Sequence, residues 1–344
     1  MKNIFLIYTE HQLNGIMNAI DFFKITNKES LLFIFVPLEF SITKNEWINE
    51  LKEKAIFDDV FIISEWSIVN SFFIRSNNVL NFTNQLINLS KYKVRLFSPI
   101  YNSDSVNLAY NILTPENLFI LDDGNASFSV IIQRQRKKYI SLYPILSSIY
   151  HRRNMLKFPK KIIYFTKYNL PFFGIDTIIN YKEAIENNTL GLDESSIIIL
   201  GSSIYETKRF HKTVVDFNDY LLILTNLHNK FSNKKIFYYA HRRESKNSIL
   251  IIEKLGFTVV SNNAPFEKVF GDFKICPHII FSFGSPILDN IGRRYKNVPR
   301  MITIKMNLSA FPNNGAEFEL IYKDFEKKSY LEVISYKNIN SFNV

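Results

Sequence analysis

The feature that most constrains the fold is an alternation of short apolar runs with amphipathic helical patterns, which continues along most of the 344 residues. Residues 4–8 form the first apolar run, and a polar turn separates it from Leu13, Ile16, Met17 and Ile20, which recur at helical spacing. Strands that alternate with helices form a parallel sheet, because each crossover helix packs on a face of the sheet. The alternation therefore predicts an α/β protein with helices on both faces of its sheets.

The alternation falls into two series, and the chain exceeds the usual size of a single domain. A polar segment that we expect to be helical, 181–188, and a connector, 191–194, separate the two series. We therefore expect two domains, residues 1–190 and 191–344. In the first domain the expected strands are residues 4–8, 31–36, 60–63, 94–97, 118–121 and 161–165, and the expected helices are 13–20, 45–54, 78–89 and 105–111. In the second domain the expected strands are residues 196–200, 236–240, 257–260, 279–283 and 301–304, and the expected helices are 216–231, 245–255, 286–291 and 317–331.

A cluster of positive and titratable side chains follows one strand of the second domain. The run 235–240 ends directly in His241, Arg242 and Arg243. Ligands of open parallel sheets bind at the carboxyl ends of the strands. An imidazole beside two guanidinium groups suits an anionic ligand, most simply a phosphate. The alternative is a strand that runs into a solvated turn.

A second anion-binding pattern follows the strand 279–283. Gly284 provides a turn, Ser285 is a good cap residue, and Pro286 suits the first helical position. The start of a helix leaves several backbone N–H groups without a partner, so it is a ready site for an anion.

An acidic turn closes the strand 118–121. Asp122 and Asp123 stand before Gly124, which allows a tight turn. Two carboxylates at a strand end suit acid–base chemistry or a metal ion. They also suit a plain cap of the turn.

The positive charge of the chain is concentrated in one stretch. The formal net charge is +10, and residues 124–175 contain no Asp or Glu. The basic residues of this stretch lie among aromatic residues and are Arg134, Arg136, Lys137, Lys138, Arg152, Arg153, Lys157, Lys160, Lys161 and Lys167. Such a stretch suits an anionic membrane surface or a phosphorylated glycolipid. It would also suit nucleic acid, or form a solvated basic face.

Several other classes of site are excluded. The only cysteine, Cys276, excludes an internal disulfide and a zinc site built from cysteines. The sequence lacks the glycine fingerprints of dinucleotide sites and of P-loops. The first apolar run is too short for a signal peptide, and no stretch is long enough to span a bilayer.

Taken in order, these landmarks resemble the motifs of the bacterial sialyltransferases, above all the lipooligosaccharide sialyltransferase family (glycosyltransferase family 52). The acidic turn is similar to the family's acidic-acidic-Gly motif, and His241 with Arg242 is similar to its His-Pro motif. The segment 281–286 is similar to the Ser/Thr motif that holds the CMP phosphate. The remaining similarities are Thr9-Glu10-His11-Gln12 to a Thr-Pro-x-Gln turn, Leu200-Gly201-Ser202 to a Leu-Gly-Gln turn, and Pro265-Phe266-Glu267 to a Pro-x-Glu motif. The chain departs from the pattern at Glu10, Arg242 and Pro286, where Pro, Pro and a second Ser or Thr are expected.

The resemblance implies a GT-B fold, in which two Rossmann-like domains face a central cleft. It implies an acceptor-binding domain at 1–190 and a CMP-sugar-binding domain at 191–344. The implied reaction is the inverting, metal-independent transfer of sialic acid from CMP-sialic acid to a terminal galactose-type hydroxyl of a lipooligosaccharide or surface glycan, with α-2,3 the expected linkage. No cofactor and no nucleic acid partner is expected. The implied location is the cytoplasm, with peripheral contact at the inner face of the bacterial inner membrane through residues 134–167.

The resemblance also assigns roles to residues. His241 is the expected acid or phosphate ligand, and the base is either Asp219 or one of Asp122 and Asp123. Gln12 is expected to face the acceptor and Glu267 the ribose of the nucleotide. The other expected substrate contacts are Gly124, Gly201, Ser202, Arg242, Ser282, Gly284 and Ser285. Because side chains alternate along a strand, the alternative for Ser282 is a side chain that points into the sheet.

Two rival interpretations remain. The first is another CMP-sugar transferase, with a Kdo donor or a capsule polymer as product. The second is a non-catalytic protein that binds a membrane or a nucleic acid through the basic stretch.

Overall fold

In the computed structural model, the chain divides into two compact units, Met1–Lys182 and Glu183–Val344, which are described separately. The structure describes residues 1–36, 46–64, 77–101, 103–124, 126–135, 159, 161–171, 174–183, 185–187, 190–206, 208–209, 212–213, 215–261, 264–306, 315–339 and 341–342. The predicted helix over 181–188 is wrong, because its described residues are not helical. Instead, Glu186 pairs in parallel with Tyr295 as an isolated bridge.

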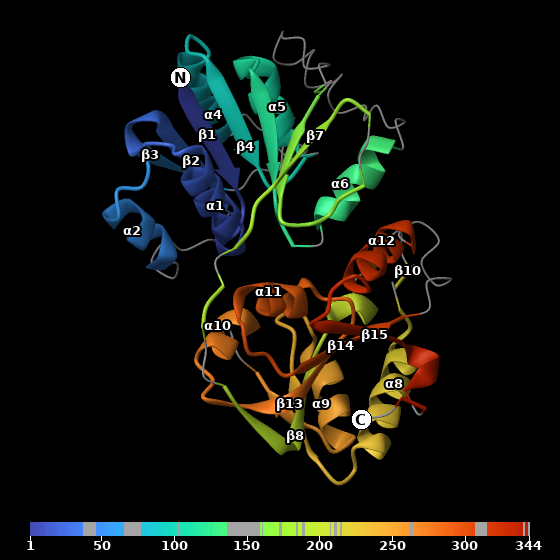
Figure 1. Ribbon diagram of the computed structural model, residues 1–344. Helices are drawn as coiled ribbons and strands as arrows, with labels where there is room; N and C mark the ends of the chain where they lie inside the picture. The colour runs from blue at the N-terminus through green and yellow to red at the C-terminus, as the bar shows by residue number, and fades with distance from the viewer. Residues whose placement is uncertain are drawn as a thin grey trace. The chain divides into compact units, whose positions relative to one another are not determined.

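Unit 1 is built on one sheet of parallel strands in the order β3-β2-β1-β4-β5-β6-β7. Its strands are β1 (Lys2–Ile7), β2 (Ser30–Val36), β3 (Asp59–Ser64), β4 (Val94–Ser98), β5 (Asn117–Leu121), β6 (Ile163–Thr166) and β7 (Thr177–Asn180). Its α-helices are α1 (Leu13–Phe23), α2 (Glu46–Glu53), α4 (Asn77–Leu89), α5 (Asp104–Leu113) and α6 (Ala126–Gln135) (Figure 1).

Aromatic side chains form the centre of the unit 1 core. The rings of Phe5 on β1 and Phe97 on β4 stack with centroids 4.7 Å apart, and Phe97 stacks on Phe119 of β5 at 4.5 Å. All three rings are buried. Since neighbouring strands stand about 4.8 Å apart, one ring per strand forms a continuous ladder across the middle of the sheet. The ladder explains why apolar runs with little alternation form these central strands.

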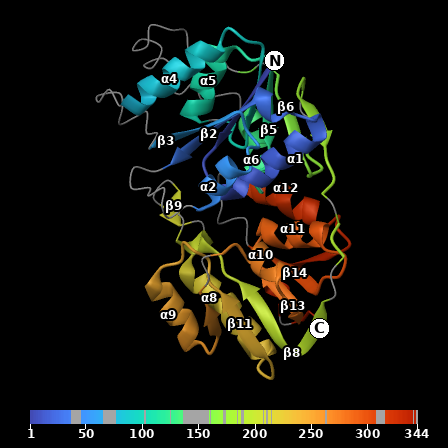
Figure 2. The ribbon, with the colours of Figure 1, turned by 90° about the vertical axis from the view of Figure 1, so that its left-hand side faces the viewer.

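Unit 2 is built on a second parallel sheet, in the order β12-β11-β8-β13-β14-β15. Its strands are β8 (Gly191–Leu200), β11 (Lys235–Tyr239), β12 (Thr258–Val260), β13 (Ile275–Ser282), β14 (Arg300–Lys305) and β15 (Leu331–Ser335), and β9 (Lys208–Arg209) with β10 (Lys212–Thr213) forms a separate hairpin. Its α-helices are α8 (Phe217–Lys230), α9 (Lys246–Lys254), α10 (Phe266–Gly271), α11 (Pro286–Arg294) and α12 (Gly315–Phe325). Apolar residues of α8 and α9 pack with one face of β8, β11 and β13 in a single core (Figure 2).

The two sheets share one topology. Numbered within its own unit, each sheet has the strand order 3-2-1-4-5-6, and unit 1 adds a seventh strand at its edge. This is the doubly wound, Rossmann-like order, in which the direction of winding reverses between the first and fourth strands. The reversal lies between β1 and β4 in unit 1 and between β8 and β13 in unit 2. The predicted α/β class with parallel sheets is confirmed.

The structure differs from the sequence prediction mainly at the edges of the sheets. The predicted helix 317–331 ends at Phe325, and Leu331 starts β15 by pairing with Met301 of β14. Strand β7 and helix α6 were not predicted. Edge strands are short and only half-buried, so they lack the strong apolar run of a central strand. None of the described helices is long and apolar enough to cross a membrane.

Candidate functional site

Unit 2 brings most of the predicted site residues to one edge of its sheet. Gly201 and Ser202 follow β8, and Gly284 and Ser285 follow β13, which is the neighbouring strand across the reversal of winding. His241 follows β11, the other neighbour of β8. Because all these strands are parallel, their carboxyl ends share an edge. Open α/β sheets bind their ligands at this place.

The start of α11 is a well-formed helix N-terminus. Ser285 is the cap residue, and its hydroxyl accepts from the backbone N–H of Ile287 at 3.3 Å. Gly284 has φ +72°, and its N–H donates to the hydroxyl of Thr303 at 2.9 Å. An ideal Cβ on Gly284 would stand 3.2 Å from the hydroxyl of Tyr322 and would be strained in any case at this φ. The turn therefore holds the positive end of α11 at the edge of the sheet.

Ser282 takes the inward orientation that the sequence left open. Ser282 is fully buried, and its hydroxyl donates to the hydroxyl of Thr303 at 3.4 Å. In this conformation the side chain of Ser282 contacts β14.

His241 sits in a tight turn that selects one tautomer. The imidazole is half-buried, and its Nδ1 accepts from the backbone N–H of Arg243 at 3.2 Å. Burial lowers the pKa of His241, and the charges of Arg243 and Arg242 lower it further. The neutral ring therefore carries its proton on Nε2 and presents a hydrogen-bond donor there.

A buried carboxylate that the sequence analysis missed lies under this turn. Oε1 of Glu244 accepts from the hydroxyls of Tyr205 at 2.6 Å and Tyr238 at 2.5 Å, and Oε2 accepts from the backbone N–H of His241 at 2.5 Å. Burial raises the pKa of Glu244, against the effect of these hydrogen bonds. The sequence does place an acid three residues after His241, at the spacing that closes a turn, and this spacing could have indicated the role of Glu244.

The same carboxylate explains the need for glycine at position 201. An ideal Cβ there would stand 2.5 Å from Oε2 of Glu244 and 2.8 Å from the hydroxyl of Tyr238. The N–H of Gly201 donates to the carbonyl of Tyr239 at 2.8 Å. Gly201 therefore permits close packing of two loops, whatever it contacts in a substrate.

Three further predicted residues of unit 2 lie at the starts of helices or turns. Glu267 is in the first turn of α10, and its Oε1 accepts from the amide of Asn290 on α11 at 2.9 Å. Asp219 is exposed in the first turn of α8, behind the cap residue Asp216. Arg242 is exposed in the turn after β11.

In unit 1, Asp122 is fully engaged by the protein. Oδ1 accepts from the hydroxyls of Ser127 at 2.9 Å and Thr166 at 2.5 Å. Oδ2 accepts from the backbone N–H of Lys167 at 2.8 Å and the hydroxyl of Tyr181 at 2.9 Å. Burial raises the pKa of Asp122, and these bonds and Lys167 act in the opposite direction. Asp122 thus ties the end of β5 to α6, to the end of β6 and to the residue after β7.

Asp123 lies beside Gln12, which follows β1. The amide Nε2 of Gln12 donates to Oδ2 of Asp123 at 3.1 Å, and its Oε1 accepts from the backbone N–H of Tyr8 at 2.8 Å. Gln12 is buried, with 2% exposure. Burial raises the pKa of Asp123, while the bond from Gln12 and the charge of His11 oppose the rise. Gly124 completes the turn with φ +57°.

Comparison with solved structures supports the two-unit architecture. The Arabidopsis thaliana protein UGT89C1, crystallised with UDP, is similar with a TM-score of 0.50 and 10% identity, over 99% of this chain and 90% of that chain. The chain has a GT-B fold. Anabaena HepE in complex with UDP and the lipopolysaccharide outer core galactosyltransferase WaaB give TM-scores of 0.49 and 0.47 at 11% and 12% identity, over 99% of this chain and 94% of each of those chains. At such identities the likeness concerns the fold alone. No family model and no curated protein sequence matches the chain.

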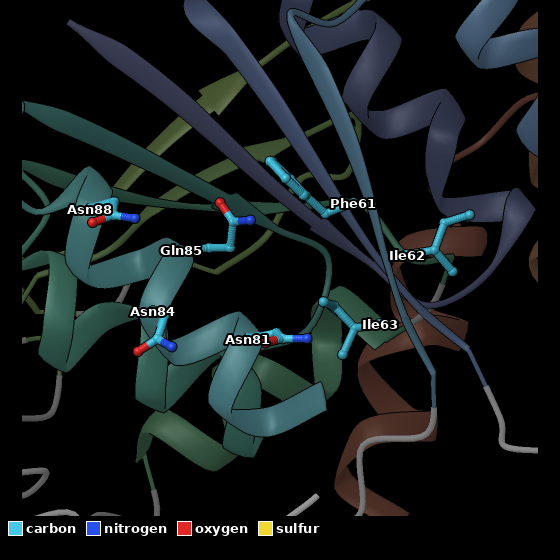
Figure 3. Close-up of a pocket in the computed structure, with 7 residues that line it drawn as sticks. All are labelled: Phe61, Ile62, Ile63, Asn81, Asn84, Gln85 and Asn88. Carbon is cyan, nitrogen blue, oxygen red and sulfur yellow. The ribbon is translucent and has the colours of Figure 1, made fainter. Parts of the chain in front are cut away.

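Two other features of the chain belong to unit 1, namely the predicted membrane-contacting stretch and a pocket. Most of the predicted membrane-contacting stretch 134–167 lies outside the described residues, which omit 136–158 and 160. A pocket of about 290 Å³ lies between β3 and α4. Figure 3 shows the residues that line it, which are Phe61, Ile62, Ile63, Asn81, Asn84, Gln85 and Asn88. None of the predicted site residues lines this pocket.

Proposed function

We propose that the chain is a glycosyltransferase with a nucleotide-sugar donor, and specifically an inverting, metal-independent sialyltransferase that uses CMP-sialic acid. One observation carries the proposal. At a single edge of unit 2, beside the reversal of winding, stand an imidazole that donates through Nε2 and the capped start of α11. The GT-B fold and the order of the sequence motifs support it by analogy.

The chemistry of the donor explains these groups. A CMP-sugar has one phosphate, which gains negative charge as the bond to the sugar breaks. The positive end of the α11 dipole stabilises that charge. Nε2 of His241 donates a hydrogen bond to the phosphate or transfers its proton as a general acid. Arg242, which is exposed in the same turn, adds positive charge.

Asp123 is the general base that we propose. Each oxygen of the Asp122 carboxylate already accepts two hydrogen bonds from the protein, so we assign Asp122 a structural role. Asp123 accepts a hydrogen bond from Gln12 on Oδ2, and burial raises its pKa, which makes it a stronger base than an ordinary aspartate. Gln12 then positions Asp123. Asp219 is the second candidate, because α8 begins at the same edge of unit 2 as the His241 turn.

The reaction follows from these roles. Asp123 removes the proton of the acceptor hydroxyl, and the hydroxyl oxygen forms a bond to the anomeric carbon of sialic acid. The bond from that carbon to the phosphate oxygen breaks on the opposite face, so the configuration inverts. CMP leaves with its charge held by His241 and the start of α11. Glu267 contacts the ribose, unit 2 holds the donor, and unit 1 supplies the acceptor contacts; the terminal galactose of a lipooligosaccharide is the acceptor class that we propose.

The test is transfer by the purified chain. The protein is incubated with CMP-sialic acid and lactose, with and without EDTA, and CMP release and sialyllactose are measured. Product in both samples supports the proposal, and loss of product in EDTA contradicts metal independence. Parallel samples with CMP-Kdo test the rival donor. No CMP release with either donor, and no CMP binding by calorimetry, would refute the proposed function.

A further inference from the structure

We propose that Glu244 is a positioning residue, which holds the turn of His241 closed and so presents the imidazole with its proton on Nε2. Its effect on catalysis rests on the function proposed above, but its effect on the imidazole does not.

The turn is closed by three hydrogen bonds between its own residues. The backbone N–H of His241 donates to Oε2 of Glu244 at 2.5 Å, and the N–H of Glu244 donates back to the carbonyl of His241 at 2.8 Å. Between them, the N–H of Arg243 donates to Nδ1 of His241 at 3.2 Å. The first bond fixes the backbone of His241, and the last requires the ring to keep Nδ1 free of a proton.

Glu244 itself is anchored from two other elements. Tyr238 lies on β11, and Tyr205 lies in the 3-10 turn Ser203–Tyr205 after β8; both hydroxyls donate to Oε1. A third hydroxyl, that of Tyr220 on α8, is 2.9 Å from the hydroxyl of Tyr238. The position of the His241 turn is therefore set by β11 together with the loop that follows β8.

A second acid, Glu206, links the loop that follows β8 to the start of α9. Both oxygens of Glu206 accept from the backbone N–H of Ser245 at 2.9 Å, and Oε1 also accepts from the hydroxyl of Ser248 at 2.6 Å. These hydrogen bonds lower the pKa of Glu206 despite the opposing effect of burial. Glu206 thus holds the start of α9, whereas Glu244 holds the backbone of His241.

Burial of the Glu244 carboxylate costs free energy, which its hydrogen bonds must offset. Glu244 is 8% exposed, and within the described part of the chain none of the ion pairs includes it. A buried carboxylate without a cation needs strong hydrogen bonds to remain ionised. One of its three donors is the backbone N–H of the predicted catalytic residue. The geometry is that of a support that fixes the orientation of a functional group.

The experiment follows the imidazole directly by NMR of the full chain, through the ¹⁵N shifts and pH titration of His241. In Glu244→Ala the turn loses its acceptor, so we expect the pKa of His241 to rise toward its ordinary value and the preference for Nε2–H to decrease. In Glu244→Gln the amide oxygen still accepts from the N–H of His241, so the tautomer is retained. Glu206→Gln is the matched control, because it alters the start of α9 and leaves the closing bonds of the turn. His241 assignments come from the spectrum of His241→Gln.

The outcomes separate the two proposals. An unchanged His241 tautomer and titration in folded Glu244→Ala would overturn the positioning role. Where Glu244→Ala does not fold, Glu244→Gln decides: the backbone N–H of His241 stays protected from hydrogen exchange if the proposal is right, and rapid exchange in the folded protein overturns it. In transfer assays Glu244→Ala should lose about tenfold to a hundredfold in kcat, with Glu244→Gln close to the unaltered protein. If the unaltered chain transfers no sugar, the proposed function fails while the NMR result still stands.

Discussion

Gly292, in the last turn of α11, offers a prediction in which two effects of opposite sign compete. Replacing glycine by alanine inside a helix usually stabilises a protein by about 0.5–1 kcal/mol. Here an ideal Cβ would stand 2.8 Å from Cγ of Tyr330 and closer still to Cδ2 and Cε2 of its ring. These are atoms near the root of the side chain, so the ring must leave its place.

Movement of that ring breaks a hydrogen bond to a buried charge. The hydroxyl of Tyr330 donates to Oδ1 of Asp289 at 2.6 Å, and Asp289 is fully buried. A hydrogen bond to a charged group contributes about 1.5–3 kcal/mol. Subtracting the helix gain of about 0.5–1 kcal/mol leaves a net destabilisation of about 1–2 kcal/mol for Gly292→Ala.

The assay is urea unfolding with a reporter for each unit, because two units can unfold separately. Both tryptophans, Trp47 and Trp66, belong to unit 1, so their fluorescence should not change. Hydrogen exchange of unit 2 peptides should report the loss. The matched control is Gly292→Ala in a Tyr330→Ala background, where the ring is absent and the alanine should stabilise. Stabilisation by Gly292→Ala in the unaltered background would refute the reasoning.

Three further predictions concern the acids and the imidazole. Asp122→Ala should reduce the free energy of unfolding of unit 1 by about 2–4 kcal/mol, measured by urea unfolding with tryptophan fluorescence, because buried donors lose their acceptor; an unchanged midpoint would contradict its structural role. Desolvation raises the pKa of buried Asp289, but the charges of Lys328 and Arg293 outweigh it and lower this pKa below the ordinary value of 3.8. The stabilisation by the Asp289 carboxylate is therefore complete above the ordinary value and is lost as pH falls through the lower folded value. Between pH 5 and pH 2 the urea midpoint of unit 2 should depend less on pH in Asp289→Asn than in the unaltered protein, and an equal pH dependence would contradict this role of the carboxylate. His241→Ala and Asp123→Asn should each lower kcat about 100-fold or more with unchanged unfolding midpoints. Asp219→Asn should keep near-normal turnover. If Asp219→Asn lowers kcat more than Asp123→Asn does, Asp219 is the base.

Local pattern was sufficient for the α/β class and for the central strands of both units. Apolar runs such as 196–200 and 279–283 mark central strands, because a central parallel strand is buried on both faces whatever its neighbours are. Helix caps are equally local. Asp216 and Ser285 were expected at helix starts, and each accepts from a backbone N–H two residues later. The resemblance of the ordered motifs to a known family also suggested the GT-B fold.

Strand order and the short edge elements required the folded chain. β15 is a strand because Leu331 pairs with Met301, a contact that its own sequence does not encode. Likewise, the reversal of winding between β8 and β13 depends on which strands pair. Pairing is a long-range property, so periodicity within one segment does not determine it.

The roles of the site residues were decided by contacts between distant parts of the chain. By sequence, Asp122 and Asp123 are equivalent neighbours. In the structure, Asp122 binds Thr166 and Tyr181, which are 44 and 59 residues away, and only Asp123 keeps a carboxylate that is not saturated by its own unit. Glu244 looks like a surface acid beside two arginines, yet Tyr205, 39 residues earlier, makes it a buried support. Composition and spacing place chemical groups at the ends of strands, but burial and hydrogen-bond partners determine which of those groups are free to react.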